Sequence, residues 1–325
     1  MKINIDYLNN INLKTFSWGQ VITALSILTP NYYLTNKVKI EIENPENIPT
    51  DETVIFALNH TDRYNCWPFQ YKMWTMRKGY PQTTTWIKGD YYNSKFLAKF
   101  FNWTNSIPIP SRGYIISEDF RDIIKEKISK IEYRLLRDLV EGKKKLKEIS
   151  DEITENLKTV LEYPRTILEG IEITSYADYV EKYYRALMAK VAEVNFQALF
   201  KRRLNVIIFP EGTRSIHLGS GKTGISHLAL KSNKKVVPVG CNGSELVYPG
   251  NSPWAKSGKV IYRVGKAIDP REIIGREIDK EFIPFSKEAE AKFKDEFHEF
   301  ALHIMEKINV LLDEENKSLV PVTVV

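Results

Sequence analysis

The chain has 325 residues, of which 43% are hydrophobic, and a formal net charge of +6 at pH 7. This is enough apolar material for a large core in one domain or two. The mild basic excess suits anionic lipid, nucleic acid or an acidic substrate. No arginine-rich tail, zinc-finger spacing or aromatic RNA-binding motif occurs, so no nucleic-acid partner is expected. Only two cysteines occur, Cys66 and Cys241, which argues against a disulfide framework and indicates a reducing, cytoplasmic compartment.

Residues 1–36 are predicted to form an N-terminal helical segment, with no secretory signal at the start. Their longest apolar stretch, residues 16–34, includes Gln20, Thr23 and Pro30 and falls short of the roughly 20 mostly apolar residues that a membrane span requires. Its aromatic and aliphatic side chains fit a helix in the lipid interface or one packed on the core, and the sequence favours neither. In the first alternative the protein is peripheral on the inner face of the membrane.

Strands and helices alternate next. Residues 37–43 alternate polar and apolar, as a half-buried strand does, and residues 54–58 form an apolar run typical of a buried strand. A helix is predicted from near Cys66, because Pro68 fits only the first turn of a helix. A β-rich strand at residues 83–87 and a helix at residues 95–103 follow.

A helical insertion is predicted at residues 117–203. Before it, Pro108 and Pro110 remove ladder donors from residues 105–113, which predicts an edge or irregular strand there. The insertion is rich in Lys and Glu, and its apolar residues recur at helical spacing, so we expect two or three long helices. Its charge runs are typical of a solvated helix face; a lipid-facing lid or a platform for a carrier protein is the alternative.

The C-terminal part returns to alternating strands and helices. Residues 206–208 predict a buried strand that opens into a polar loop. The elements expected after it are a helix at residues 225–231, a strand at 235–240, a strand at 259–268 and an amphipathic helix at 287–312.

Two of the predicted strands end in polar clusters. Residues 54–58 lead into NHTDRYN at 59–65, and residues 206–208 lead into FPEGTRS at 209–215. In α/β folds, ligands bind at the carboxyl ends of strands. Gly212 permits backbone conformations that a side chain would forbid, and Arg214 offers a planar fork of donors for a phosphate or carboxylate. The alternative for this loop is a structural ion pair between Glu211 and Arg214.

These clusters resemble two sequence blocks of the glycerolipid acyltransferases, the family of glycerol-3-phosphate and 1-acylglycerol-3-phosphate O-acyltransferases. The family's first block is His, four residues, Asp; here His60 is in place and the fifth position is Asn65. The third block, residues 209–215, is complete. The second and fourth blocks resemble residues 107–112 and 235–240, so the likeness covers about residues 37–270 apart from the inserted helices.

The resemblance implies an α/β fold with a mixed, mostly parallel sheet flanked by helices and a long inserted helical subdomain. The predicted domains are the N-terminal segment 1–36, an acyltransferase domain of residues 37–116 and 204–325, and the insertion 117–203.

The resemblance also implies that His60 is the general base, with an imidazole that exchanges protons near neutral pH. An asparagine carbonyl can accept from the ring N–H and fix the tautomer, but it supplies no charge. Asp62 could supply a carboxylate from a tighter turn, so either Asp62 or Asn65 is the predicted orienting group. The family's acceptor-binding residues correspond here to Arg112, Glu211, Gly212, Thr213, Arg214 and Lys222.

The reaction implied is direct transfer of a fatty acyl group from an acyl thioester to a hydroxyl of a glycerol phosphate or lysophospholipid, as in phospholipid biosynthesis. The donor would be carried on coenzyme A or acyl carrier protein, with no metal or prosthetic group. Two other interpretations are an acyltransferase for another alcohol or amine acceptor, and a non-catalytic relative that binds lipid or an acyl carrier. The absence of the motif aspartate would fit the second.

Overall fold

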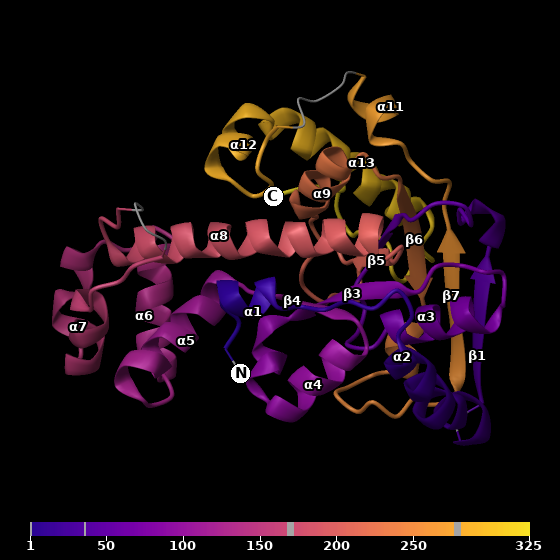
Figure 1. Ribbon diagram of the computed structural model, residues 1–325, viewed down its shortest axis with the longest axis horizontal. Helices are drawn as coiled ribbons and strands as arrows, with labels where there is room; N and C mark the ends of the chain where they lie inside the picture. Colours follow the sequence, from indigo (N-terminus) through magenta and orange to yellow (C-terminus); the bar gives the residue numbers. More distant parts are fainter. Residues whose placement is uncertain (1, 36, 168–171, 276–280) are drawn as a thin grey trace. The chain divides into compact units, whose positions relative to one another are not determined.

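A seven-stranded sheet organises the structure (Figure 1). The computed structural model describes residues 2–35, 37–167, 172–275 and 281–325. The strand order across the sheet is β1-β7-β6-β2-β5-β3-β4. The strands in chain order are β1 (Val38–Glu43), β2 (Ile55–Leu58), β3 (Thr83–Lys88), β4 (Ser106–Ile109), β5 (Asn205–Ile208), β6 (Val236–Asn242) and β7 (Gly258–Val264).

The sheet is mixed and mostly parallel, as expected. β2 runs parallel to both of its neighbours, β5 and β6, and the pairs β3–β5 and β1–β7 are also parallel. β6 and β7, which Figure 1 shows side by side, are antiparallel. All residues of β2, β5 and β6 are buried, which explains their continuous apolar runs. β4, with its two neighbouring prolines, is the last strand in the order, so the edge position predicted for it is confirmed.

The helices confirm most sequence expectations and correct two of them. The C-terminal helix predicted at residues 287–312 is divided into α12 and α13 at Phe293. The α-helices are α1 (Ile5–Asn9), α2 (Trp18–Thr23), α3 (Cys66–Thr75), α4 (Lys95–Trp103), α5 (Arg112–Ile124), α6 (Lys130–Val140), α7 (Glu155–Glu162), α8 (Tyr176–Phe196), α9 (Gly224–Ser232), α10 (Ser244–Val247), α11 (Pro270–Ile274), α12 (Lys287–Lys292) and α13 (Lys294–Val310).

The expectation of two or three long helices in the insertion is wrong, because α8, with 21 residues, is the long helix and those before it are short. α5 ends at Ile124 and is capped by Lys125, which has a left-handed φ of 66°. α6 then starts with a capping box, in which Ser129 and Glu132 each satisfy the other's backbone N–H. These two caps divide into two helices a segment whose apolar spacing would fit one continuous helix.

The chain forms two compact units. The first comprises Met1–Asn10, Ile87–Ala98 and Pro108–Val191, and the second comprises Ile11–Trp86, Lys99–Ile107 and Ala192–Val325. Within the first unit, a buried ion pair joins Arg165 to Asp119. The domain limits expected at residues 37, 117 and 204 stay a prediction.

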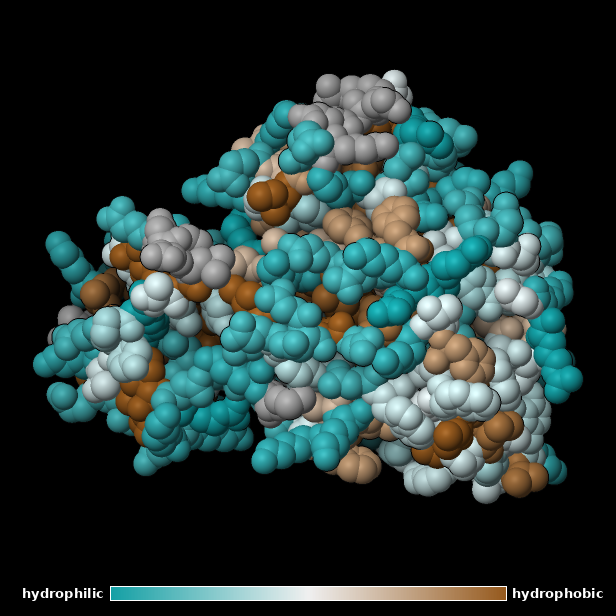
Figure 2. Space-filling model, in the orientation of Figure 1, coloured by the Kyte–Doolittle hydropathy of each residue, from teal (hydrophilic) through white to brown (hydrophobic). Residues whose placement is uncertain are grey.

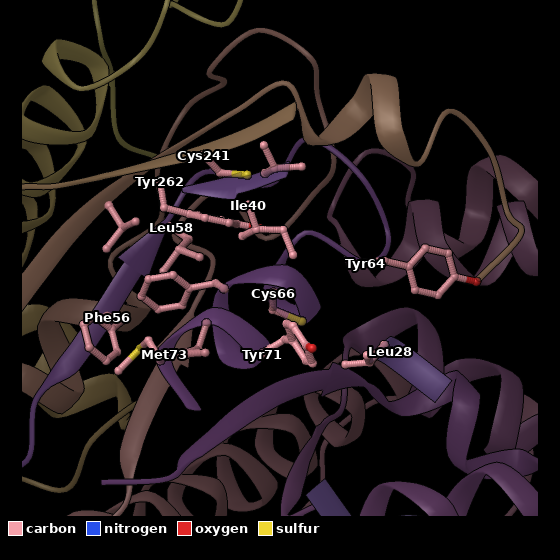
Figure 3. Close-up of a cluster of buried hydrophobic side chains, with 14 of the residues drawn as sticks. Leu28, Ile40, Phe56, Leu58, Tyr64, Cys66, Tyr71, Met73, Cys241 and Tyr262 are labelled. Carbon is pink, nitrogen blue, oxygen red and sulfur yellow. The ribbon is translucent and has the colours of Figure 1, made fainter. Parts of the chain in front are cut away.

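The core of the second unit lies between α3 and one face of the sheet (Figure 3). Phe56 and Leu58 of β2 and Tyr262 of β7 meet Phe69 and Met73 of α3 in this cluster. The opposite face of β6 is covered by α13, which also packs against α9. A Cβ at Gly240 would lie 2.6 Å from the backbone oxygen of Leu311, so only glycine allows this close approach.

Candidate active site

The two polar clusters meet at the carboxyl ends of β2 and β5, within the second unit. β2 and β5 are parallel neighbours with Ala57 opposite Ile208, so the residues that follow the two strands emerge together. The backbone N–H of His60 donates to Glu211 Oε2 at 2.7 Å. The backbone N–H of Ser215 donates to the carbonyl of His60 at 2.9 Å. Both polar groups of the His60 backbone are therefore held by the 209–215 block.

The imidazole of His60 has a fixed tautomer. The Nδ2 of Asn65 donates to the carbonyl of Asn59 at 2.7 Å, so the amide oxygen of Asn65 faces His60. That oxygen lies 3.2 Å from Nδ1 of His60 and can only accept, so Nδ1 carries the hydrogen. The ring also stacks on Phe209, with centroids 4.1 Å apart and planes at 19°. The lone pair is thus on Nε2, where a general base needs it.

The pKa of His60 is lowered to about 4, mainly by burial; the hydrogen bond to Asn65 opposes this shift and the positive charge of Arg214 adds to it. The ring is therefore neutral at pH 7, which is the protonation state of a base. Because Asn65 is neutral, it adds no charge that would stabilise an imidazolium.

Asp62 is engaged in its own turn. Its buried carboxylate accepts from the backbone N–H of Tyr64 at 2.7 Å and from the hydroxyl of Thr61 at 3.0 Å. Burial raises the pKa of Asp62, which these hydrogen bonds oppose. Of the two orienting groups that the sequence offered, Asn65 is the one hydrogen-bonded to the ring. Burial also raises the pKa of Cys66 to about 12, so this thiol is no nucleophile near neutral pH.

Glu211 joins two parts of the site. The residue is only 2% exposed; one carboxylate oxygen accepts from the backbone N–H of His60 and the other from the backbone N–H of Gly219 at 2.9 Å. Burial raises the pKa of Glu211. Among the described residues, no ion pair links Glu211 with Arg214, so the structural pair considered from the sequence is absent there.

Two exposed cations, Arg214 and Lys222, lie at the loop that follows β5. Gly212 has a φ of 66°, and a Cβ on it would lie 3.3 Å from Nζ of Lys222, so the lysine side chain lies over this glycine. Thr213 and Arg214 are exposed, and the charge of Arg214 reaches His60. Neither Lys222 nor Arg214 has an ion-pair partner within the described ranges.

Arg112 lies in the first unit, at the start of α5. Its guanidinium makes a bidentate contact with Glu181, with Nε–Oε2 at 2.6 Å and Nη2–Oε1 at 3.1 Å. It also lies 4.2 Å from the ring centroid of Tyr184. The acceptor-binding role of Arg112 stays a prediction.

Two residues that sequence reasoning missed support Asn65. The side chain of Asn59 donates to the carbonyl of Cys241 in β6 at 2.9 Å and accepts from its N–H at 2.7 Å. The hydroxyl of Tyr262 in β7 donates to the backbone carbonyl of Asn65 at 2.6 Å. A signal for Asn59 was available, since a polar residue ends a buried apolar strand there; Tyr262 had none.

Of the comparisons with known proteins, the match to a family model agrees with the sequence resemblance. A family model described as "Acyltransferase" matches residues 169–242, a stretch that contains the 209–215 block and β6 and excludes His60. No curated protein matches the chain. Among solved structures, the chain is similar to the 1-acyl-sn-glycerophosphate (LPA) acyltransferase PlsC from Thermotoga maritima. The identity is 17%, the TM-score is 0.41, and the match covers 89% of this chain and 80% of that one.

Proposed function

We propose that this chain transfers a fatty acyl group from an acyl thioester to a hydroxyl of a phosphorylated glycerolipid acceptor; the match of residues 169–242 to the "Acyltransferase" family model supports the acyl-transfer part of this proposal. The observation that carries this proposal is the state of His60, which has a neutral ring with its Nδ1–H directed to Asn65 and the charge of Arg214 within reach. No described residue hydrogen-bonds to Nε2, so this atom is available to an acceptor hydroxyl.

In the proposed reaction, Nε2 of His60 takes the proton of the acceptor hydroxyl while its oxygen attacks the thioester carbonyl. The new C–O bond forms, the C–S bond breaks, and the imidazolium returns the proton to the leaving sulfur. No covalent acyl-enzyme is needed. The donor is a fatty acyl thioester on coenzyme A or acyl carrier protein.

The test is thiol release by the purified protein from palmitoyl-coenzyme A and from palmitoyl carrier protein. Each donor is paired with glycerol-3-phosphate, with lysophosphatidic acid and with unphosphorylated monoacylglycerol. Release that depends on a phosphorylated acceptor would support the proposal and identify the donor. Release only with the unphosphorylated acceptor, or with none, would contradict it; the latter outcome would favour a lipid-binding relative without activity.

We further propose that Arg214 and Lys222 bind the acceptor's phosphate. Arg214→Ala should raise KM for the phosphorylated acceptor by about 10- to 100-fold, because a hydrogen bond to a charged group contributes about 1.5–3 kcal/mol. The KM for an unphosphorylated acceptor should change little, and Lys222→Ala should act in the same direction. Steady-state kinetics with both acceptors measure this, with the exposed Arg202→Ala as a control for loss of one positive charge. An equal rise in KM for both acceptors would show that Arg214 does not bind the phosphate.

A membrane surface is the proposed partner of the N-terminal part of the second unit. Residues 15–36 contain no charged side chain, and Figure 2 shows apolar side chains among neutral ones over the α2 region of Figure 1. None of the helices that the structure describes is long and apolar enough to cross a membrane. The apolar patch consists of Phe16, Trp18, Ile22, Leu25, Tyr33 and Leu34, each between 46% and 77% exposed.

Replacing Ile22 and Leu25 together by glutamine should lower binding to anionic phospholipid vesicles by at least about tenfold, because burying one aliphatic side chain contributes about 1.5–3 kcal/mol. Sedimentation with vesicles of phosphatidylglycerol and phosphatidylcholine measures the bound fraction. The matched control is the double variant Ile131→Gln and Leu146→Gln, which changes two exposed aliphatic residues of the first unit. Equal binding by the two double variants would show that the patch is not the membrane contact.

A further inference from the structure

The position where the family's first block has aspartate is occupied here by an asparagine that uses both ends of its amide. Asn65 is completely buried. Its Oδ1 faces Nδ1–H of His60 at 3.2 Å, and its Nδ2 donates to the carbonyl of Asn59 at 2.7 Å. The first contact needs an acceptor and the second needs a donor. Only an amide, or a carboxyl group that keeps its proton, provides both.

A carboxylate at position 65 would place an oxygen against the carbonyl oxygen of Asn59, lone pair against lone pair, at a site without access to water. The Asn59 carbonyl has little freedom to turn away. The side chain of Asn59 is itself 2% exposed and binds both the N–H and the carbonyl of Cys241 in the centre of β6. The backbone of residue 65 is fixed from the other side by the hydroxyl of Tyr262.

We propose that this site is built around a neutral orienting amide: Asn65 orients His60, Asn59 is a positioning residue that holds Asn65, and an aspartate at position 65 impairs the site. Asparagine at this position is therefore an integrated part of the structure. The catalytic consequence rests on the proposed function, whereas the tautomer of His60 and the incompatibility of a carboxylate are properties of the folded protein alone.

The test compares the wild type with Asn65→Asp, Asn65→Ala and, as a control that adds the same charge at an exposed asparagine, Asn251→Asp. The first readout is the ¹⁵N NMR spectrum of the imidazoles at pH 7. The chain has five histidines, and the signal that His60→Gln removes is that of His60. The wild type should show hydrogen on Nδ1. A hydrogen on Nε2 would overturn the proposal whether or not the protein is active.

The second readout is thermal stability at pH 5 and pH 8. The titratable groups around residue 65 are His60, Asp62, Cys66, Cys241 and Tyr262, none of which is a cation at pH 8; the charge of the exposed Arg214 reaches His60. The pKa of an aspartate there should be raised relative to the unfolded chain, so that the carboxyl group is protonated at pH 5 and is ionised at pH 8 only at a cost in folding free energy. The Asn65→Asp variant should therefore lose melting temperature as pH rises from 5 to 8, relative to wild type and to Asn251→Asp. An equal melting temperature at both pH values would overturn the proposal.

The third readout is turnover in the thioester assay at pH 8. Asn65→Asp should lower kcat by about tenfold or more, since a buried polar group without its partner has a cost of this order. Asn59→Ala should lower kcat by a similar factor and leave the acceptor KM within about twofold, because it disturbs the ring and not the two cations. A kcat for Asn65→Asp equal to or above wild type would show that the site accepts the charged group and would refute the inference. A wild type without turnover would contradict the proposed function, while the NMR and melting data would still decide this inference.

Discussion

Replacing His60 by alanine should lower kcat by about 10²- to 10⁴-fold, the usual contribution of a positioned general base. The donor KM should change little, because the ring is placed to handle a proton and not to grip the acyl carrier. The measurement is acceptor-dependent thiol release with both donors. A variant with more than a tenth of wild-type turnover would show that another group takes the proton.

The pH dependence gives a second check on the same residue. A base is active in its neutral form, and the pKa of His60 lies at about 4, so kcat/KM should hold as pH falls from 7 to 5 and decline only near pH 4. An ordinary histidine would lose activity around its unperturbed pKa of about 6.5. An acid limb near 6.5 would contradict the environment described here for His60.

Glu211→Gln should lower kcat by about 5- to 150-fold, the equivalent of about 1–3 kcal/mol for one buried backbone donor left without an acceptor. The glutamine oxygen can serve His60 or Gly219, but its NH₂ then faces the N–H of the other. The acceptor KM should change less than kcat, because both carboxylate oxygens are already occupied by the backbone. A large rise in acceptor KM at constant kcat would instead place Glu211 in contact with the substrate.

Thermal stability separates this effect from unfolding. Burial raises the pKa of Glu211, so its ionised form costs folding stability once pH exceeds that pKa. The amide avoids this cost, which offsets part of the lost hydrogen bond, and the melting temperature should therefore fall by only a few degrees. Glu299→Gln, at an exposed glutamate of α13, is the matched control. A collapse of stability in Glu211→Gln would mean that the residue holds the fold as a whole.

The position of the site could be read from the sequence because local patterns encode it. Two buried apolar runs each ended in a polar cluster, and parallel neighbours bring such ends together. The contact between His60 and Asn65 is also local, since the two residues share one turn. The role of Glu211 could not be read, because its partners are backbone N–H groups, and no pattern of side chains records where a distant backbone will lie.

The short helices of the insertion were not predicted, for a different reason. The apolar spacing of residues 124–139 suits a single helix, and the chain breaks it at Lys125 and restarts it at Ser129. The capping box of Ser129 and Glu132 was present in the sequence as a Ser-x-x-Glu pattern. A left-handed lysine has no comparable signal, because residues other than glycine and asparagine seldom adopt a positive φ at a helix end.

The two hydrogen bonds that hold the His60 backbone to the 209–215 block have a consequence for folding during synthesis. The bond from His60 to Glu211 spans 151 positions, and β2 remains without its β5 neighbour until that part of the chain exists. When only the residues up to the insertion have been synthesised, β2 has neither of its neighbouring strands, and His60 at its end has no partner for its backbone. Contacts of such long range form late and slowly, so activity should appear only after the second half has emerged and closed the sheet around the first.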